Sequence, residues 1–124
     1  SKIKNIKLNV SAPFHCKLMK KATENLKDEI LNLNFKEIKN PIISNFSANP
    51  SISGLEIKNL LVSQIEGRVK WLESIKFMLD KGTKNFIEIG PGKVLSGLIK
   101  RIEKNINVKS VNTESDIKEL INNV

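Results

Sequence analysis

Residues 86–102 have the sequence FIEIGPGKVLSGLIKRI, and this stretch predicts the fold class. Residues 86–89, Phe-Ile-Glu-Ile, are typical of a short buried strand. This strand must stop at Gly90-Pro91-Gly92, because the glycines allow positive φ and the proline cannot continue a central strand. Apolar residues then recur at helical spacing at Val94, Leu95, Leu98, Ile99 and Ile102. A strand, a tight turn and an amphipathic helix form half of a βαβ unit, which predicts an α/β fold.

The turn at residues 90–93 does not match a phosphate-binding loop. The Walker pattern requires four residues between its glycines and a Ser or Thr after the lysine, whereas here a valine follows Lys93. The dinucleotide fingerprint fails as well, since Leu95 occupies the position of its third glycine. We therefore interpret the turn as a structural corner at the carboxyl end of a strand, an edge at which α/β proteins also place ligands.

The charge of the chain favours a protein partner over a nucleic acid. The 124 residues carry a formal net charge of +8, from nineteen lysines and two arginines against thirteen acidic side chains. Lysine is less suited than arginine to bidentate recognition of phosphates or bases, and the basic residues form no arginine-rich block. A nucleic-acid-binding module stays an alternative, but an acidic protein partner is at least as compatible with such a surface.

The cysteine count and the hydropathy of the chain indicate its cellular compartment. Cys16 is the single cysteine, so the chain forms no internal disulfide, which favours a reducing environment. No apolar run approaches the roughly 18 residues of a membrane helix. We expect a cytoplasmic protein with no membrane partner and no cofactor. One histidine beside one cysteine, without spaced partners, also predicts no metal site.

Periodicity predicts alternating strands and helices along the rest of the chain. Strands are expected at residues 3–10, 42–46, 86–89 and 106–111, and helices at residues 18–33, 55–65, 69–81, 94–102 and 117–121. Residues 47–54 are expected to form a polar loop, and Trp71, Leu72, Ile75, Met78 and Leu79 to face the core. The connecting helices suit a larger parallel sheet, so we expect the remaining strands upstream of this chain.

His15 is the candidate general base. It follows Pro13 and Phe14 at a predicted corner between strand and helix, where a base could be held rigidly. The alternative interpretation is a structural histidine at the start of a helix, whose ring is hydrogen-bonded to nearby backbone groups. No serine lies in a G-x-S-x-G elbow, and the adjacent Cys16 is a poor nucleophile for His15 because neighbouring side chains usually diverge.

Gln64 lies in the last turn of a predicted helix that ends at Gly67. Its side chain is expected to be a solvated amide, since glutamine is mostly exposed. Its backbone carbonyl is more informative, because the last carbonyls of a helix lack internal partners. Such a carbonyl could accept the Nδ1–H of a histidine in place of the aspartate of a catalytic triad.

Four runs together resemble the carboxyl-terminal part of one enzyme family. They are SAPFHCKLMK, PIISN, LVSQIEGRVKWLESIKFML and FIEIGPGKVLSGLIKRI. In order and spacing they resemble the malonyl-CoA:acyl-carrier-protein transacylases, whose relatives include acyltransferase domains of fatty-acid and polyketide synthases. The resemblance implies that residues 11–124 form the carboxyl-terminal part of an α/β-hydrolase-like large domain. Residues 1–10 would be the last strand of a ferredoxin-like insertion.

The resemblance also implies a reaction and roles for three residues. Malonyl passes from malonyl-CoA to a serine, and then to the phosphopantetheine thiol of acyl carrier protein in fatty acid biosynthesis. His15 matches the catalytic histidine, Gln64 the residue whose main-chain carbonyl orients it, and Phe14 a position associated with acyl choice. The serine elbow would lie upstream, so we expect this chain alone to be inactive. The alternatives are a non-catalytic domain that binds a carrier protein and an acyltransferase domain of a polyketide synthase.

Overall fold

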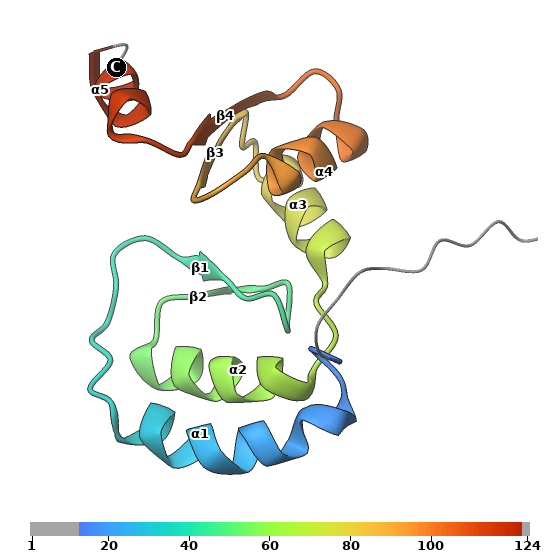
Figure 1. Ribbon diagram of the computed structural model, residues 1–124, viewed down its shortest axis with the longest axis vertical. Coiled ribbons are helices and arrows are strands. Elements are labelled where there is room, and N and C mark those ends of the chain that lie inside the picture. The colour runs from blue at the N-terminus through green and yellow to red at the C-terminus, as the bar shows by residue number, and fades with distance from the viewer. Residues whose placement is uncertain (1–12, 123–124) are drawn as a thin grey trace, which may run out of the picture. The chain divides into compact units, whose positions relative to one another are not determined.

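The structure is a computed structural model that describes residues 13–122 (Figure 1). The expected strand at residues 3–10 lies outside these residues. The chain divides into two compact units, Ser1–Lys70 and Trp71–Val124. Within the described residues, five α-helices and two small sheets confirm the α/β class.

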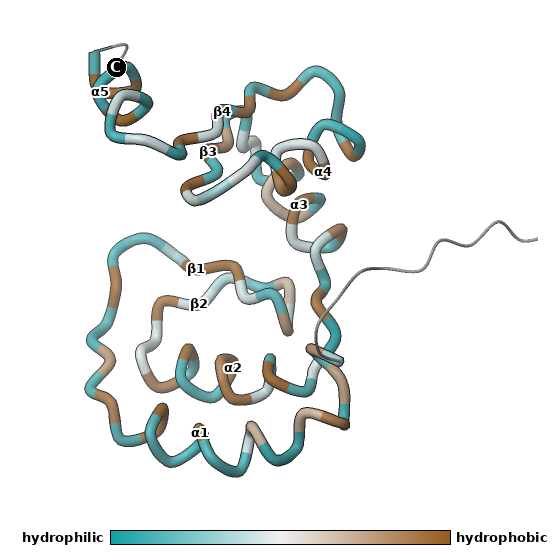
Figure 2. Tube along the Cα trace, in the orientation of Figure 1, coloured by the Kyte–Doolittle hydropathy of each residue, from teal (hydrophilic) through white to brown (hydrophobic). Residues whose placement is uncertain are grey.

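The first unit packs two helices and a hairpin together. Its elements are the 3₁₀ helix η1 (Lys17–Met19), α1 (Lys20–Asn32), β1 (Ile42–Ile43), β2 (Pro50–Ser51) and α2 (Gly54–Glu66). Helices α1 and α2 lie side by side (Figure 1). Hydrophobic and hydrophilic positions alternate along both helices, as amphipathic helices require (Figure 2). The Lys58 ammonium on α2 donates to the carbonyls of Leu31 at 2.8 Å and Leu33 at 2.7 Å, which caps the end of α1.

The expected strand at residues 42–46 is shorter than predicted, and its pairing is antiparallel. Only Ile42 and Ile43 are extended, and they pair antiparallel with Ser51 and Pro50, inside the expected polar loop. The strand ends early because the Ser44 hydroxyl accepts hydrogen bonds from the following backbone N–H groups of Phe46 and Ser47. The Ser44 side chain thereby turns the chain into a hairpin.

The second unit contains the expected βαβ element. Its elements are α3 (Trp71–Asp80), β3 (Asn85–Ile89), α4 (Val94–Ile102), β4 (Asn107–Val111) and α5 (Glu114–Asn122). Strands β3 and β4 are parallel, with a register from Asn85↔Asn107 to Ile89↔Val111, and α4 connects them. Ile75 of α3 and Ile99 of α4 are almost fully buried and form the centre of this unit. The strand, turn and helix predicted from residues 86–102 are confirmed.

Burial in the second unit corrects two expectations. β3 is not buried, because Ile87 is 49% and Ile89 82% exposed. Alternate residues of a strand face opposite sides, so Ile87 and Ile89 share the uncovered face, while Phe86 and Glu88 are half-buried on the other. Leu72 is 48% exposed rather than inward, since it lies roughly 100° around α3 from the half-buried Trp71.

Within residues 13–122, no helix has the length and apolarity to cross a membrane. The expected cytoplasmic location stays a prediction.

Candidate active site

The site begins at the corner that carries His15. The backbone of His15 has a φ of 60°, in the left-handed region that few residues other than glycine adopt. Such a conformation costs about 1–3 kcal/mol and persists only where the surroundings hold it. The Cys16 thiol supports the corner by donating to the Pro13 carbonyl at 3.1 Å, and η1 starts directly afterwards.

The His15 ring is hydrogen-bonded to the end of α2. Its Nδ1 lies 2.9 Å from the backbone carbonyl oxygen of Gln64, a residue 49 positions further along the chain. A carbonyl can only accept, so Nδ1 carries the proton and donates. In the neutral ring this places the lone pair on Nε2, the nitrogen that can take a proton from another group. The structure thus places the His15 ring and the Gln64 carbonyl within the hydrogen-bonding distance that a base and its orienting acceptor require.

The Gln64 carbonyl is open because the helix stops. α2 ends at Glu66, and Gly67 has extended backbone angles, φ −86° and ψ 144°. In a helix that continued, the N–H of residue 68 would point at this carbonyl. Gly67 was expected at the helix end, and it does cap α2, but without the left-handed conformation of a common glycine cap.

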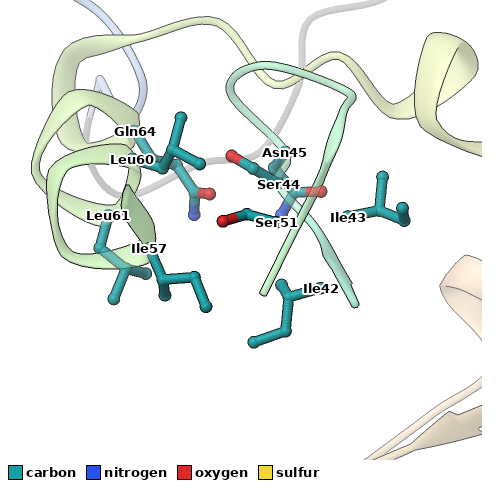
Figure 3. A pocket seen from close by; sticks show the side chains of 9 residues that line it. All are labelled: Ile42, Ile43, Ser44, Asn45, Ser51, Ile57, Leu60, Leu61 and Gln64. Carbon is teal, nitrogen blue, oxygen red and sulfur yellow. The ribbon is translucent and has the colours of Figure 1, made fainter. Parts of the chain in front are cut away.

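A pocket of about 230 Å³ lies between α2 and the hairpin. Figure 3 shows the side chains of Gln64, Leu60, Leu61 and Ile57 on the helix side. The hairpin side is formed by Ile42, Ile43, Ser44, Asn45 and Ser51. The Gln64 side chain is therefore half-buried at the pocket rather than a solvated amide. Sequence analysis missed the hairpin residues of this pocket, for which the PIISN run was the available signal.

Phe14 and Cys16 flank His15 without joining the pocket. The Phe14 side chain is 57% exposed beside the corner, and it is not part of the pocket lining. Cys16 is half-buried and points its thiol at the Pro13 carbonyl. Within residues 13–122, no serine or cysteine is hydrogen-bonded to the His15 ring, and no group of three or more His, Cys, Asp or Glu side chains could hold a metal ion. These residues therefore offer a candidate base, His15, without a bonded nucleophile.

The Gly90-Pro91-Gly92 turn of the second unit is held by Glu88. The Glu88 carboxylate accepts hydrogen bonds from the backbone N–H groups of Leu95 at 3.0 Å and Ser96 at 2.8 Å. It also accepts from the Ser96 hydroxyl, which contacts that of Ser110. The Ser96 hydroxyl is the main cause that lowers the pKa of Glu88 below its ordinary value, while desolvation acts in the opposite direction. The carboxylate occupies the amino-terminal end of α4, where a helix favours a negative charge.

Comparison with known proteins identifies relatives for this arrangement. No family model matches the chain. A curated protein from Bacillus subtilis is 41% identical over 112 residues, which are 90% of this chain and 35% of the relative. A crystal structure from Bartonella henselae is 40% identical with a TM-score of 0.84, covering 93% of this chain and 37% of that one. A third structure is 33% identical with a TM-score of 0.85, covering 94% of this chain and 38% of that one.

These likenesses define the class to which the chain is similar, the acyltransferases. More particularly, the curated relative is a malonyl CoA-acyl carrier protein transacylase, and the Bartonella henselae structure is an acyl-carrier-protein-S-malonyltransferase. The third structure is a malonyl-transacylase in complex with its type II PKS acyl-carrier protein. The chain spans a little more than a third of the length of the proteins that it matches.

Proposed function

We propose that this chain supplies the general base of a malonyl-CoA:acyl-carrier-protein transacylase. The enzyme moves a malonyl group from malonyl-CoA to the phosphopantetheine thiol of acyl carrier protein in fatty acid biosynthesis. The observation that carries the proposal is the 2.9 Å hydrogen bond between Nδ1 of His15 and the Gln64 carbonyl. The relatives support the substrates, since they are named for malonyl-CoA and acyl carrier protein.

In this proposal, His15 moves one proton in each half-reaction. Nε2 of His15 removes the hydroxyl proton of a serine as the serine oxygen attacks the malonyl thioester. The imidazolium is stabilised by the Gln64 carbonyl, and it returns the proton to the leaving thiolate of coenzyme A. In the second half-reaction, Nε2 takes the proton of the phosphopantetheine thiol, whose sulfur attacks the acyl-serine. The proton then returns to the serine oxygen as malonyl leaves.

The serine is proposed to lie in a part of the enzyme outside this chain. The chain matches a little more than a third of its relatives, and no serine of the described residues is bonded to the His15 ring. We propose that residues 11–124 belong to the carboxyl-terminal part of an α/β-hydrolase-like large domain, and residues 1–10 to the end of a ferredoxin-like insertion. On its own, the chain would then form no acyl-enzyme.

Phe14 is proposed to contact the acyl group. It directly precedes His15, and its ring is 57% exposed at the corner, so it is accessible to a substrate that approaches Nε2. This role follows the resemblance described above.

A polyketide pathway is the second candidate function. One of the solved neighbours is a transacylase in complex with a type II PKS acyl-carrier protein. The chemistry at His15 would be the same, and the carrier protein would differ. A non-catalytic domain that binds a carrier protein remains the alternative in which His15 has no chemical role.

A chimaera tests the proposal. This chain replaces the matched segment of the Bacillus subtilis transacylase, and the purified chimaera is assayed for malonyl transfer from malonyl-CoA to acyl carrier protein. We expect transfer by the chimaera, and none by the chain alone. A folded chimaera that binds carrier protein without transferring malonyl would support the non-catalytic alternative. Comparing carriers from fatty acid and polyketide systems separates the two pathways.

A further inference from the structure

The hairpin of the first unit makes close contact with the end of α2. At Gly67 an added Cβ would overlap the ring of Phe46 and would lie 2.7 Å from the Ser63 carbonyl oxygen. The φ of Gly67 is −86°, so its backbone angle is not what requires glycine. Space is the requirement, because the Phe46 ring lies directly over the backbone at the point where the helix stops.

Two further contacts hold the segment that follows α2 to the hairpin. The backbone N–H of Lys70 donates to the Asn45 carbonyl at 2.7 Å. The Lys70 ammonium lies 6.0 Å from the centre of the Phe46 ring, within range of a cation–π interaction. The chain between Gly67 and Lys70 is therefore fixed by residues 45 and 46 at both of its ends.

The hairpin loop that carries Phe46 is itself braced. Ser44 is 8% exposed, and its hydroxyl accepts from the N–H groups of Phe46 at 3.2 Å and Ser47 at 3.4 Å. Its backbone carbonyl accepts from Ala48 at 2.8 Å. A loop held in this way presents the Phe46 ring in one position, as a positioning element must.

We propose that Phe46 and Gly67 are positioning residues for His15, an inference that rests on the proposed function. Their contact ends α2 at Glu66 and directs the following backbone away, which keeps the Gln64 carbonyl open to the His15 ring. Moving this helix end would move the acceptor, and the ring would lose the bond that selects the Nδ1–H tautomer. Neither side chain touches the reacting atoms, so their effect acts through His15.

The test uses the single histidine of the chain as its probe. The 15N spectrum of the imidazole in the full 124-residue chain, recorded near pH 9, where an imidazole is ordinarily neutral, distinguishes the two tautomers. We expect Nδ1–H for the unchanged chain, and a mixture of tautomers for Gly67→Ala and for Phe46→Leu. Gly97→Ala is the matched control, because a Cβ at Gly97 meets nothing within 4 Å. Thermal unfolding shows whether each variant is folded, and Phe46→Leu is the milder change should Gly67→Ala prevent folding.

Kinetics of the chimaera provide a second readout. A displaced base should lower kcat by about tenfold to a hundredfold, while the KM for malonyl-CoA stays the same. The double variant should lose no more than the more affected single variant, since both changes disrupt one contact. Additive losses, or unchanged tautomers in folded Gly67→Ala and Phe46→Leu, would overturn the inference. A chimaera without transfer would contradict the proposed function, and the tautomer measurement on the chain would still decide the role of Phe46 and Gly67.

Discussion

The two units of the chain use polar contacts for different purposes. In the first unit, polar groups join segments far apart in the sequence, such as His15 to Gln64 and Lys58 to the end of α1. In the second unit, each carboxylate accepts hydrogen bonds at the start of a nearby helix. Glu88 of β3 accepts from the start of α4, and Asp116 of α5 accepts from the backbone just before its own helix. Residues 86–102, the stretch that predicts the fold class, therefore lie in the unit whose contacts are structural. The candidate chemistry lies in the other unit.

The sequence motif that best predicts the fold therefore need not be the one that carries the reactive group. The glycines of the Gly90-Pro91-Gly92 turn both have positive φ, 134° and 91°, so the sequence there is required by the backbone. His15 also has positive φ, but it is a residue with a side chain capable of proton transfer. Glycine adopts a positive φ without strain and indicates backbone geometry alone, whereas a histidine held at a positive φ motivates a hypothesis of function.

The largest effect is expected from His15→Ala in the chimaera. Loss of the base should lower malonyl transfer by about two to four orders of magnitude. The Glu88→Gln chimaera, assayed per folded molecule, should retain its transfer rate. Steady-state kinetics with acyl carrier protein measures both. A loss below about tenfold for His15→Ala, with the fold intact, would remove the base role.

Glu88→Gln should instead destabilise the second unit. An amide offers one acceptor oxygen, so it cannot replace both carboxylate oxygens that receive the N–H groups of Leu95 and Ser96. Hydrogen exchange measured by mass spectrometry should show faster exchange in α4 and β3, with α1 and α2 unchanged. Glu29→Gln on the exposed side of α1 is the control and should change neither unit. Equal loss of protection in both units would contradict the inference that the contacts of Glu88 stabilise the second unit alone.

Acid should also destabilise the second unit. The pKa of Glu88 is lowered chiefly by the Ser96 hydroxyl, and that of Asp116 chiefly by the backbone N–H of Asn112. A lowered folded pKa adds stability above the unfolded value, about 4.3 for Glu and 3.9 for Asp, and this stability is lost as the pH falls through the folded pKa. We expect protection of α4 and α5 to fall below about pH 4. Circular dichroism together with hydrogen exchange from pH 7 to pH 2 would show it, and loss in the first unit before the second would be the opposite result.

The smallest effect is expected from Gln64→Ala. The acceptor for His15 is a backbone carbonyl, which the substitution leaves in place at the end of α2. The rate of malonyl transfer by the chimaera should change by less than about threefold, and this small change would come from the altered pocket. A loss equal to that of His15→Ala would mean that the Gln64 side chain does the chemistry.

Local signals made much of the second unit predictable. The period of residues 94–102 and the glycine turn before them specify α4 and the end of β3, because both depend on neighbours within a few positions. The β1–β2 hairpin was missed, since two-residue strands have no measurable period and their ends depend on the Ser44 hydroxyl. The exposure of Ile87 and Ile89 could not be inferred either, because it depends on which surfaces cover β3.

The candidate site required more than local pattern. His15 was selected by its corner and by resemblance, and Gln64 by its place in the last turn of a helix. Their contact joins residues 49 positions apart, and no periodicity reports such a distance. The proposed role of Phe46 could not be predicted from the sequence for the same reason, since it depends on the space above Gly67 in the folded chain.

Intact-mass measurement after mixing with malonyl-CoA tests the central claim, that this chain supplies a base and not the nucleophile. The chimaera should gain one malonyl group on its Bacillus subtilis portion, more slowly when it carries His15→Ala. The 124-residue chain alone should gain none. A stoichiometric malonyl adduct on the chain alone, at any serine or at Cys16, would contradict the account.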